Sequence, residues 1–380
     1  MDIRDFSKAK RIVIKLGTNV LRNESGEASL PRLYSYIEDI STLVKSGKEV
    51  LIITSGAVGF GRKKINVEKS DDIVLKQACA AIGQSKLMSI YENGFDSYGI
   101  TIAQVLLTED DFANRKRYLN LRNTLNRLLE LGVVPIINQN DTVSTFELET
   151  LYTDALVSFA DNDKLSALVA SEMDADLLLI LSDVNGLYDC NPKDNTNAKI
   201  IPVVNDVTEE IMNLANGVSA GGRGGMKTKL EAAKVVTRFG GRMIIANGKL
   251  PNVIKEVFTG KELGTIFLPA DDKLTGKKCW ICYATNIIGK IKINNGAKKA
   301  LAEETSSLLP IGITTIIHEF KKGDVVSILD EEDKEFARGI SNYSSDDCKK
   351  IMGRHSDDIL QILGYKNYDA VITRDNITIL

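Results

Sequence analysis

Short apolar runs alternate with longer amphipathic stretches as far as residue 246. A continuous apolar run is typical of a strand buried in a parallel sheet, whereas apolar positions spaced three and four apart predict a helix. The runs predict strands at 11–16, 50–54, 101–107, 133–138, 176–181 and 242–246. The amphipathic stretches predict helices at 29–44, 75–95, 114–131, 164–173 and 227–239. This alternation predicts an α/β fold, a mostly parallel sheet sandwiched by helices.

Polar and glycine residues follow four of the predicted strands directly. They are Lys15–Gly17, Ser55–Gly56, 138–141 and Ser182–Asp183. The carboxyl ends of parallel strands meet at one edge of the sheet, and ligands bind there. The sequence therefore predicts one binding rim that is shared by these four strand ends.

A glycine-rich stretch, Gly217–Lys229, precedes the last predicted helix of this region. Glycines allow backbone N–H groups to approach a ligand, and a helix N-terminus adds unpaired donors and a positive dipole. Lys227 and Lys229 add mobile positive charge, so the stretch predicts a phosphate site. It is not a Walker A loop, because the Gly-Lys-Ser/Thr signature is missing. A flexible linker is the alternative interpretation.

The composition changes near 264–276, and the pattern beyond it predicts short strands at 290–294, 312–320 and 325–329. We expect two domains, over 1–268 and 277–380, the second small and mostly β. Such a module suggests RNA binding, but residues 277–380 hold 15 basic and 15 acidic side chains. A neutral module lacks the basic surface that binding to a phosphate backbone requires, so a nucleic-acid partner is not expected.

Composition points to a cytoplasmic protein. The chain has 380 residues, 43% of them hydrophobic, and a formal net charge of −3. No apolar run reaches the roughly 18 residues of a membrane span, and the first residues lack the apolar core of a secretory signal. Five cysteines in a chain of this length indicate free thiols. Cys279 and Cys282 lie in a predicted strand, on opposite faces, so a shared metal is not expected.

Six motifs, taken in this order, resemble the glutamate 5-kinase family of the amino-acid kinase superfamily, and the resemblance covers nearly the whole chain. The C-terminal part is similar to a PUA domain, with Ser306–Gly312 and Arg338–Gly339 as its recognisable pieces. The six motifs are Val13–Asn19, Thr54–Ala57, Ile137–Asp141, Asp161–Asp163, Ser182–Asp183 and Gly224–Lys229.

The resemblance implies an amino-acid kinase fold with a PUA-like tail, and ATP- and Mg²⁺-dependent phosphorylation of the side-chain carboxylate of L-glutamate. It also implies feedback inhibition by proline and a homo-oligomer (dimer or tetramer). The Mg²⁺ ligands stay open, and composition rather than the resemblance gives no sign of membrane association. It places Lys15, Lys229 and Asp163 in catalysis, and Ser55, Asp141 and Asn162 on glutamate. For the nucleotide it implies Lys15, Ser182, Asp183, Arg223, Gly224, Gly225, Met226, Lys227, Thr228 and Lys229.

The residues themselves are compatible with this chemistry. A side-chain carboxylate is already ionised at pH 7, so the nucleophile needs no general base. The site must instead neutralise charge as the phosphoryl group passes, which two lysines and a metal ion can do. Asp161 and Asp163 then orient a lysine or a metal-bound water rather than abstract a proton.

Simpler interpretations stay open for individual residues, and other functions stay open for the chain. Lys15 could be a solvated lysine at a strand end, and Ser55, Asp141, Ser182 and Asp183 could be turn or cap residues. Asp161–Asp163 could be only the cap of the helix that follows. The chain could also be a sister kinase acting on aspartate, N-acetylglutamate or carbamate. From a different class, it could be an RNA-binding or regulatory protein acting through its C-terminal module.

Overall fold

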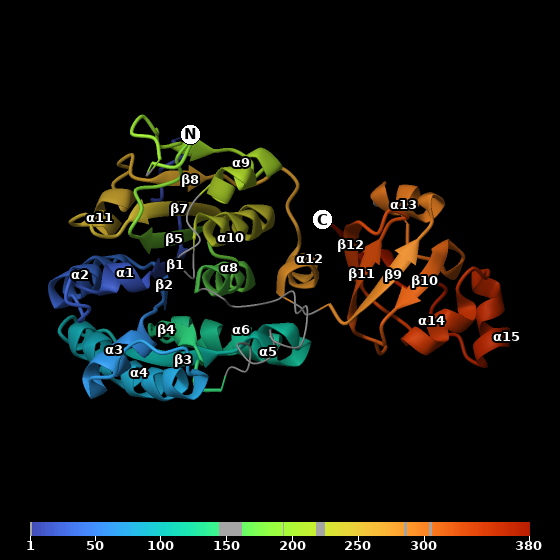
Figure 1. Ribbon diagram of the computed structural model, residues 1–380, viewed down its shortest axis with the longest axis horizontal. Coiled ribbons are helices and arrows are strands. Elements are labelled where there is room, and N and C mark those ends of the chain that lie inside the picture. The colour runs from blue at the N-terminus through green and yellow to red at the C-terminus, as the bar shows by residue number, and fades with distance from the viewer. Residues whose placement is uncertain (1, 144–161, 193, 218–224, 285–286, 304–305) are drawn as a thin grey trace. The chain divides into compact units, whose positions relative to one another are not determined.

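The computed structural model describes residues 2–143, 162–192, 194–217, 225–284, 287–303 and 306–380, and every structural statement concerns these residues (Figure 1). They form two compact units, one reaching Leu274 and one running from Thr275 to Leu380.

The first unit is built on an eight-stranded sheet with the order β3-β4-β2-β1-β5-β7-β8-β6. Each neighbouring pair is parallel except β7 and β8, which are antiparallel. The strands are β1 (Arg11–Leu16), β2 (Glu49–Ile53), β3 (Ile102–Leu107), β4 (Val134–Gln139), β5 (Leu177–Ser182), β6 (Val203–Val204), β7 (Arg242–Asn247) and β8 (Thr265–Phe267).

Helices cover both faces of this sheet (Figure 1). The described helices of the first unit are α1 (Thr18–Leu21), α2 (Leu30–Lys45), α3 (Ala57–Ile65), α4 (Ile73–Asp96), α5 (Glu109–Ala113), α6 (Arg115–Glu130), α8 (Asn162–Glu172), α9 (Glu209–Asn213), α10 (Met226–Phe239) and α11 (Val253–Phe258). The predicted strands and helices of this region are all present, with ends that shift by one or two residues.

Alternation along β1 decides which side chains reach the site. Ile12, Ile14 and Leu16 join a hydrophobic core with residues of α2, α4 and α11. Successive side chains of a strand face opposite sides, so Val13 and Lys15 lie on the other face. Helix α8 packs on that face, against β1, β2, β4 and β5. Lys15 is therefore directed toward α8.

The second unit holds a five-stranded sheet with the order β10-β9-β11-β12-β13, in which only β9 and β11 are parallel. Its buried core includes Ile291, Val326 and Ile328. The sequence analysis did not predict its last two strands or its helices. The elements are β9 (Gly289–Ile293), β10 (Ile313–Ile317), β11 (Val325–Leu329), β12 (Glu335–Ile340), β13 (Ile377–Ile379), α12 (Gly276–Cys279), α13 (Asn295–Ala302), α14 (Ser345–Ile351) and α15 (Ile359–Leu363).

The strand predicted around Cys279 and Cys282 is wrong. Helix α12 ends at Cys279 and continues as a π-helical turn over Trp280–Ala284. A short apolar run suits a buried helix as well as a strand, and only tertiary packing decides between them. Residues three apart on a helix share a face, so our reason for excluding a shared metal fails. Within the described ranges, however, no group of three metal-ligating side chains exists.

Candidate active site

Two lysines from different elements converge on one aspartate at the rim. The Nζ atom of Lys15 lies 2.6 Å from Oδ1 of Asp163, and Nζ of Lys229 lies 2.9 Å from Oδ2. The hydroxyl of Thr228 donates to the same Oδ2 at 3.0 Å. Both lysines are 4% exposed and Asp163 is fully buried. The structure thus brings together the three residues predicted for catalysis.

The local sequence explains how the two lysines arrive there. Lys15 is the fifth residue of β1, and its neighbours across the sheet are Ile53 of β2 and Ile180 of β5. Gly17 then allows a close passage: its N–H donates to the carbonyl of Leu181 at 3.0 Å, and an added Cβ would lie 3.1 Å from that oxygen. Lys229 is buried on the first turn of α10.

The cluster joins two ammonium groups and one carboxylate, and all three side chains are buried. Interactions between charges are stronger in such a setting than in bulk water. The two ammonium groups come from different elements, so both can contact the oxygens of one incoming anion. The cluster is therefore suited to binding and stabilising phosphoryl oxygens.

A second cluster, made of neutral amides and hydroxyls, adjoins the first. The Nδ2 group of Asn162 lies 2.6 Å from the carbonyl oxygen of Thr54, 2.8 Å from Oγ of Ser55 and 3.0 Å from Oδ1 of Asn138. Asn138 in turn donates from Nδ2 to Oε1 of Gln84 at 2.9 Å. We call these residues, Thr54, Ser55, Gln84, Asn138 and Asn162, the amide cluster.

Ser182 and Asp183 form the third part of the rim, at the end of β5. Asn19 donates to Oδ2 of Asp183 at 2.8 Å, and the hydroxyl of Ser182 donates to Oδ1 at 3.2 Å. Burial by itself would raise the pKa of Asp183, but hydrogen bonds from Asn19, from its own backbone N–H and from Ser182 hold the pKa below its usual value. This side chain is therefore an ionised acceptor at neutral pH.

The other predicted residues differ in how far the structure describes them. Asp141 is half-buried in the turn after β4. Gly225 caps α10, and Lys227 is exposed on its first turn. Arg223 and Gly224 lie outside the described residues, as does Asp161.

Sequence reasoning did not assign a role to Asn19, Thr54, Asn138 or Gln84. Thr54 and Asn138 lie at predicted strand ends, which was the available signal. Gln84 had none, because it sits in the middle of α4 and reaches Asn138 only through the tertiary fold.

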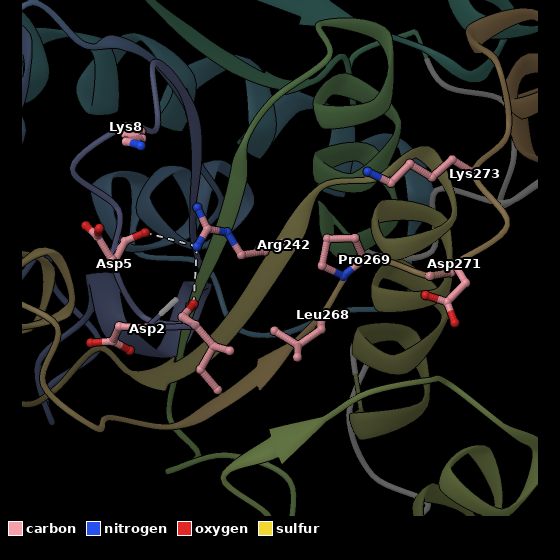
Figure 2. Close-up of a pocket in the computed structure, with 10 residues that line it drawn as sticks. Asp2, Asp5, Lys8, Arg242, Leu268, Pro269, Asp271 and Lys273 are labelled. Carbon is pink, nitrogen blue, oxygen red and sulfur yellow. Dashed lines mark hydrogen bonds between the residues drawn. The ribbon is translucent and has the colours of Figure 1, made fainter.

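A hollow at the amino end of β7 lies away from this rim (Figure 2). Arg242 lines it and donates to the carbonyl oxygens of Ile3 and Asp5 at 3.2 and 3.0 Å. Acidic and basic side chains, among them Asp271 and Lys273, alternate around it. Because Arg242 is already hydrogen-bonded to backbone carbonyls of the N-terminal segment, we interpret the hollow as the place where that segment is anchored.

The chain matches the amino acid kinase family over residues 10–247 and the PUA domain over residues 289–363. It therefore belongs to the amino acid kinase family. No described helix is long and apolar enough to cross a membrane.

Relatives named glutamate 5-kinase match almost the entire chain. The protein from Thermoanaerobacter sp. is 45% identical over 374 residues, covering 97% of this chain and 98% of the relative. The protein from Syntrophotalea carbinolica is 46% identical over 376 residues, 98% of each chain. Within the amino acid kinases, the chain belongs with the glutamate 5-kinases.

Proposed function

We propose that this protein transfers the γ-phosphoryl group of ATP to the side-chain carboxylate of L-glutamate, the first step of proline biosynthesis. The products are γ-glutamyl phosphate and ADP. Full-length similarity to glutamate 5-kinases supports the substrates. The observation that carries the mechanism is the convergence of Lys15 and Lys229 on one buried aspartate.

The transfer needs no proton. A carboxylate oxygen of glutamate forms the new P–O bond, while the bond from the γ-phosphorus to the bridging oxygen breaks and ADP leaves with its electron pair. The nucleophile is ionised at pH 7, because a glutamate side chain has a pKa of about 4.3. Catalysis then rests on holding two anions in line and stabilising the charge that develops on the phosphoryl oxygens.

The cluster of Lys15, Lys229 and Asp163 supplies that stabilisation. Lys15 approaches from β1 and Lys229 from α10, so the ammonium groups come from two different elements. Asp163 holds both Nζ atoms in place before the substrates arrive, which limits the reorganisation needed during transfer. Asp163 is a positioning residue here and takes up no proton.

The amide cluster is suited to a free amino acid. The Nδ2 group of Asn162 lies within hydrogen-bond distance of oxygens of Thr54, Ser55 and Asn138, and we assign its Oδ1 to the substrate. The carboxylate of Asp141, which follows Asn138 in the turn after β4, is a second acceptor. Oxygen acceptors fit the α-ammonium group of glutamate. N-acetylglutamate and carbamate lack that group, so the cluster favours glutamate over both.

The nucleotide is assigned to the third part of the rim and to the start of α10. Ser182 and Asp183 offer polar contacts, and the segment 223–229 offers N–H groups and lysine side chains. Mg²⁺ would enter on the ATP phosphates, where it neutralises charge. Both carboxylate oxygens of Asp163 already face ammonium groups, so the structure gives no ground for placing the ion on that residue. Inhibition by proline and a homo-oligomeric state belong to this proposal as well.

A substrate panel tests the function. ADP release is measured with L-glutamate, L-aspartate, N-acetyl-L-glutamate and carbamate, each with and without proline. Hydroxylamine is added in parallel, because it traps an acyl phosphate as a hydroxamate. We expect glutamate alone to give rapid ADP release with equal hydroxamate. Faster turnover of another acid would overturn the assignment of the substrate, and ADP without hydroxamate would overturn the carboxylate as the acceptor.

A further inference from the structure

We propose that Gln84 is a positioning residue for substrate binding: its side chain fixes the amide of Asn138 and, through it, the orientation of Asn162. The inference rests on the proposed role of Asn162 in holding glutamate. Gln84 lies on α4, 54 residues before Asn138, and is 8% exposed. Nothing in its local sequence marks it as functional.

Backbone groups identify which atom of each amide in the cluster is the oxygen and which is the nitrogen. The N–H of Gln139 can only donate, and it contacts Oδ1 of Asn138 at 2.9 Å. Oδ1 of Asn138 is thereby assigned, and its Nδ2 must face Gln84. Because Nδ2 can only donate, Gln84 must present its Oε1, as the distance of 2.9 Å records.

The same reasoning fixes the other end of the chain of amides. The carbonyl of Thr54 can only accept, so Nδ2 of Asn162 must face it at 2.6 Å. Oδ1 of Asn138 accepts from that same Nδ2 at 3.0 Å. If Asn138 turned over, its Nδ2 would meet Nδ2 of Asn162, donor against donor. The bond from Asn138 to Gln84 opposes that turn.

Close helix packing holds Gln84 in position. Helices α3 and α4 cross next to it at two glycines: an added Cβ on Gly83 would lie 1.7 Å from the carbonyl oxygen of Ala57, and one on Gly61 would lie 1.8 Å from that of Cys79. Any side chain at Gly83 or Gly61 would therefore force the helices apart. The backbone that carries Gln84 is set by this crossing.

A purely structural role explains Gln84 poorly. Its Nε2 group is buried and has no hydrogen-bond partner among the described residues. A buried donor without a partner lowers stability, so an apolar side chain of similar size would serve packing as well or better. What an apolar side chain cannot do is accept the hydrogen bond from Asn138.

The test compares Gln84→Met with Gln84→Glu in the full-length protein. Methionine keeps the volume but removes the acceptor, so we expect the KM for glutamate to rise about tenfold, with the KM for ATP unchanged. Thermal stability should change little, because the unpartnered Nε2 of Gln84 is lost while Nδ2 of Asn138 loses its acceptor. The side chain introduced by Gln84→Glu restores an acceptor toward Asn138. The KM of this variant for the substrate glutamate should therefore lie within about threefold of wild type. Leu87→Met, a buried change on the same helix, controls for repacking.

A double-mutant cycle with Asn138→Ala makes the test independent of packing. If Gln84 acts through Asn138, Gln84→Met should change the KM for glutamate less than about twofold in the Asn138→Ala background. A full additional loss there would overturn the proposal, as would a glutamate KM near wild type in Gln84→Met. If Gln84→Met does not fold, failure of Gln84→Glu to stay near wild type would overturn it. Absence of glutamate-dependent turnover in the wild type would instead overturn the underlying function.

Discussion

Two successive residues at the start of α8 lie in contrasting surroundings, one neutral and one charged. Asn162 faces neutral groups: the carbonyl of Thr54, the hydroxyl of Ser55 and the amide of Asn138. Asp163 faces two ammonium groups at 2.6 and 2.9 Å. Neutral amides give direction without net charge, which suits recognition of a substrate that does not change at that end. Charged groups suit the phosphoryl group, where charge moves during the reaction.

The far end of α8 gives a second contrast. Glu172 is as buried as Asp163, but neither of its carboxylate oxygens has a close hydrogen-bond partner among the residues that the structure describes, and the backbone N–H of Arg122 lowers its pKa only weakly. Arg122 lies near enough to influence it, yet its guanidinium is paired with Asp174 at 2.5 Å. The same helix therefore holds one buried carboxylate that is matched by cations and one that is not.

The largest effect is expected at the charged end. Lys229→Ala removes one of the two ammonium groups, so kcat should fall about 10²-fold or more, with smaller changes in the KM for ATP. The measurement is steady-state ADP release at saturating glutamate. Lys234→Ala, on the same helix, is the matched control and should stay near wild type. Near-normal turnover by a folded Lys229→Ala protein would remove this lysine from the mechanism.

Glu172 allows the unmatched carboxylate to be tested by pH. Burial, only partly offset by Arg122 and Arg115, raises the pKa of this side chain from 4.5 to about 8. The native state therefore keeps a proton that the unfolded chain releases. The contribution of this proton to the free energy of unfolding is fully present below pH 4.5 and is lost as the pH rises through 8. Between these two values the native state binds more protons than the unfolded chain.

Glu172→Gln keeps the shape but cannot ionise. We expect it to be more stable than wild type at pH 9 by on the order of 5 kcal/mol, with the difference vanishing near pH 4. Urea unfolding at several pH values measures this free energy. A difference that does not depend on pH would show that Glu172 is ionised in the native state or finds a partner.

A smaller effect, confined to one substrate, is expected at the neutral end. Asn162→Ala removes the amide that contacts Thr54, Ser55 and Asn138, so the KM for glutamate should rise about tenfold while the KM for ATP stays close to wild type. Initial rates over a grid of both substrates separate the two constants. Parallel increases in both would contradict the division between Asn162 and Asp163.

The sequence was informative where one strand or one periodicity decides the outcome. The run at 11–16 predicted β1, and the polar residues at strand ends predicted a shared rim. The family resemblance singled out Lys15, Lys229 and Asp163, and the chemistry of phosphoryl transfer predicted that the aspartate orients a lysine or a metal-bound water. The bond between Gln84 and Asn138 could not be predicted, because it depends on how α4 crosses α3. The helix at Cys279 was missed because its apolar run has no periodicity of its own.

The smallest effect is expected from removing the second unit. Every residue assigned to either end of the site lies between Lys15 and Lys229, within the first unit. The N–H of Leu274 donates to the carbonyl of Arg238 at 2.7 Å, so a stop after Leu274 keeps the last contact of that unit. Units with their own cores survive separation at a linker, and kcat should hold within about threefold. The response to proline or the oligomeric state would change instead.

The measurement is glutamate-dependent ADP release by the truncated, monodisperse protein. Complete loss of activity with the fold retained by circular dichroism would mean that the second unit completes the active site, and that the contrast between Asn162 and Asp163 does not contain all of the machinery.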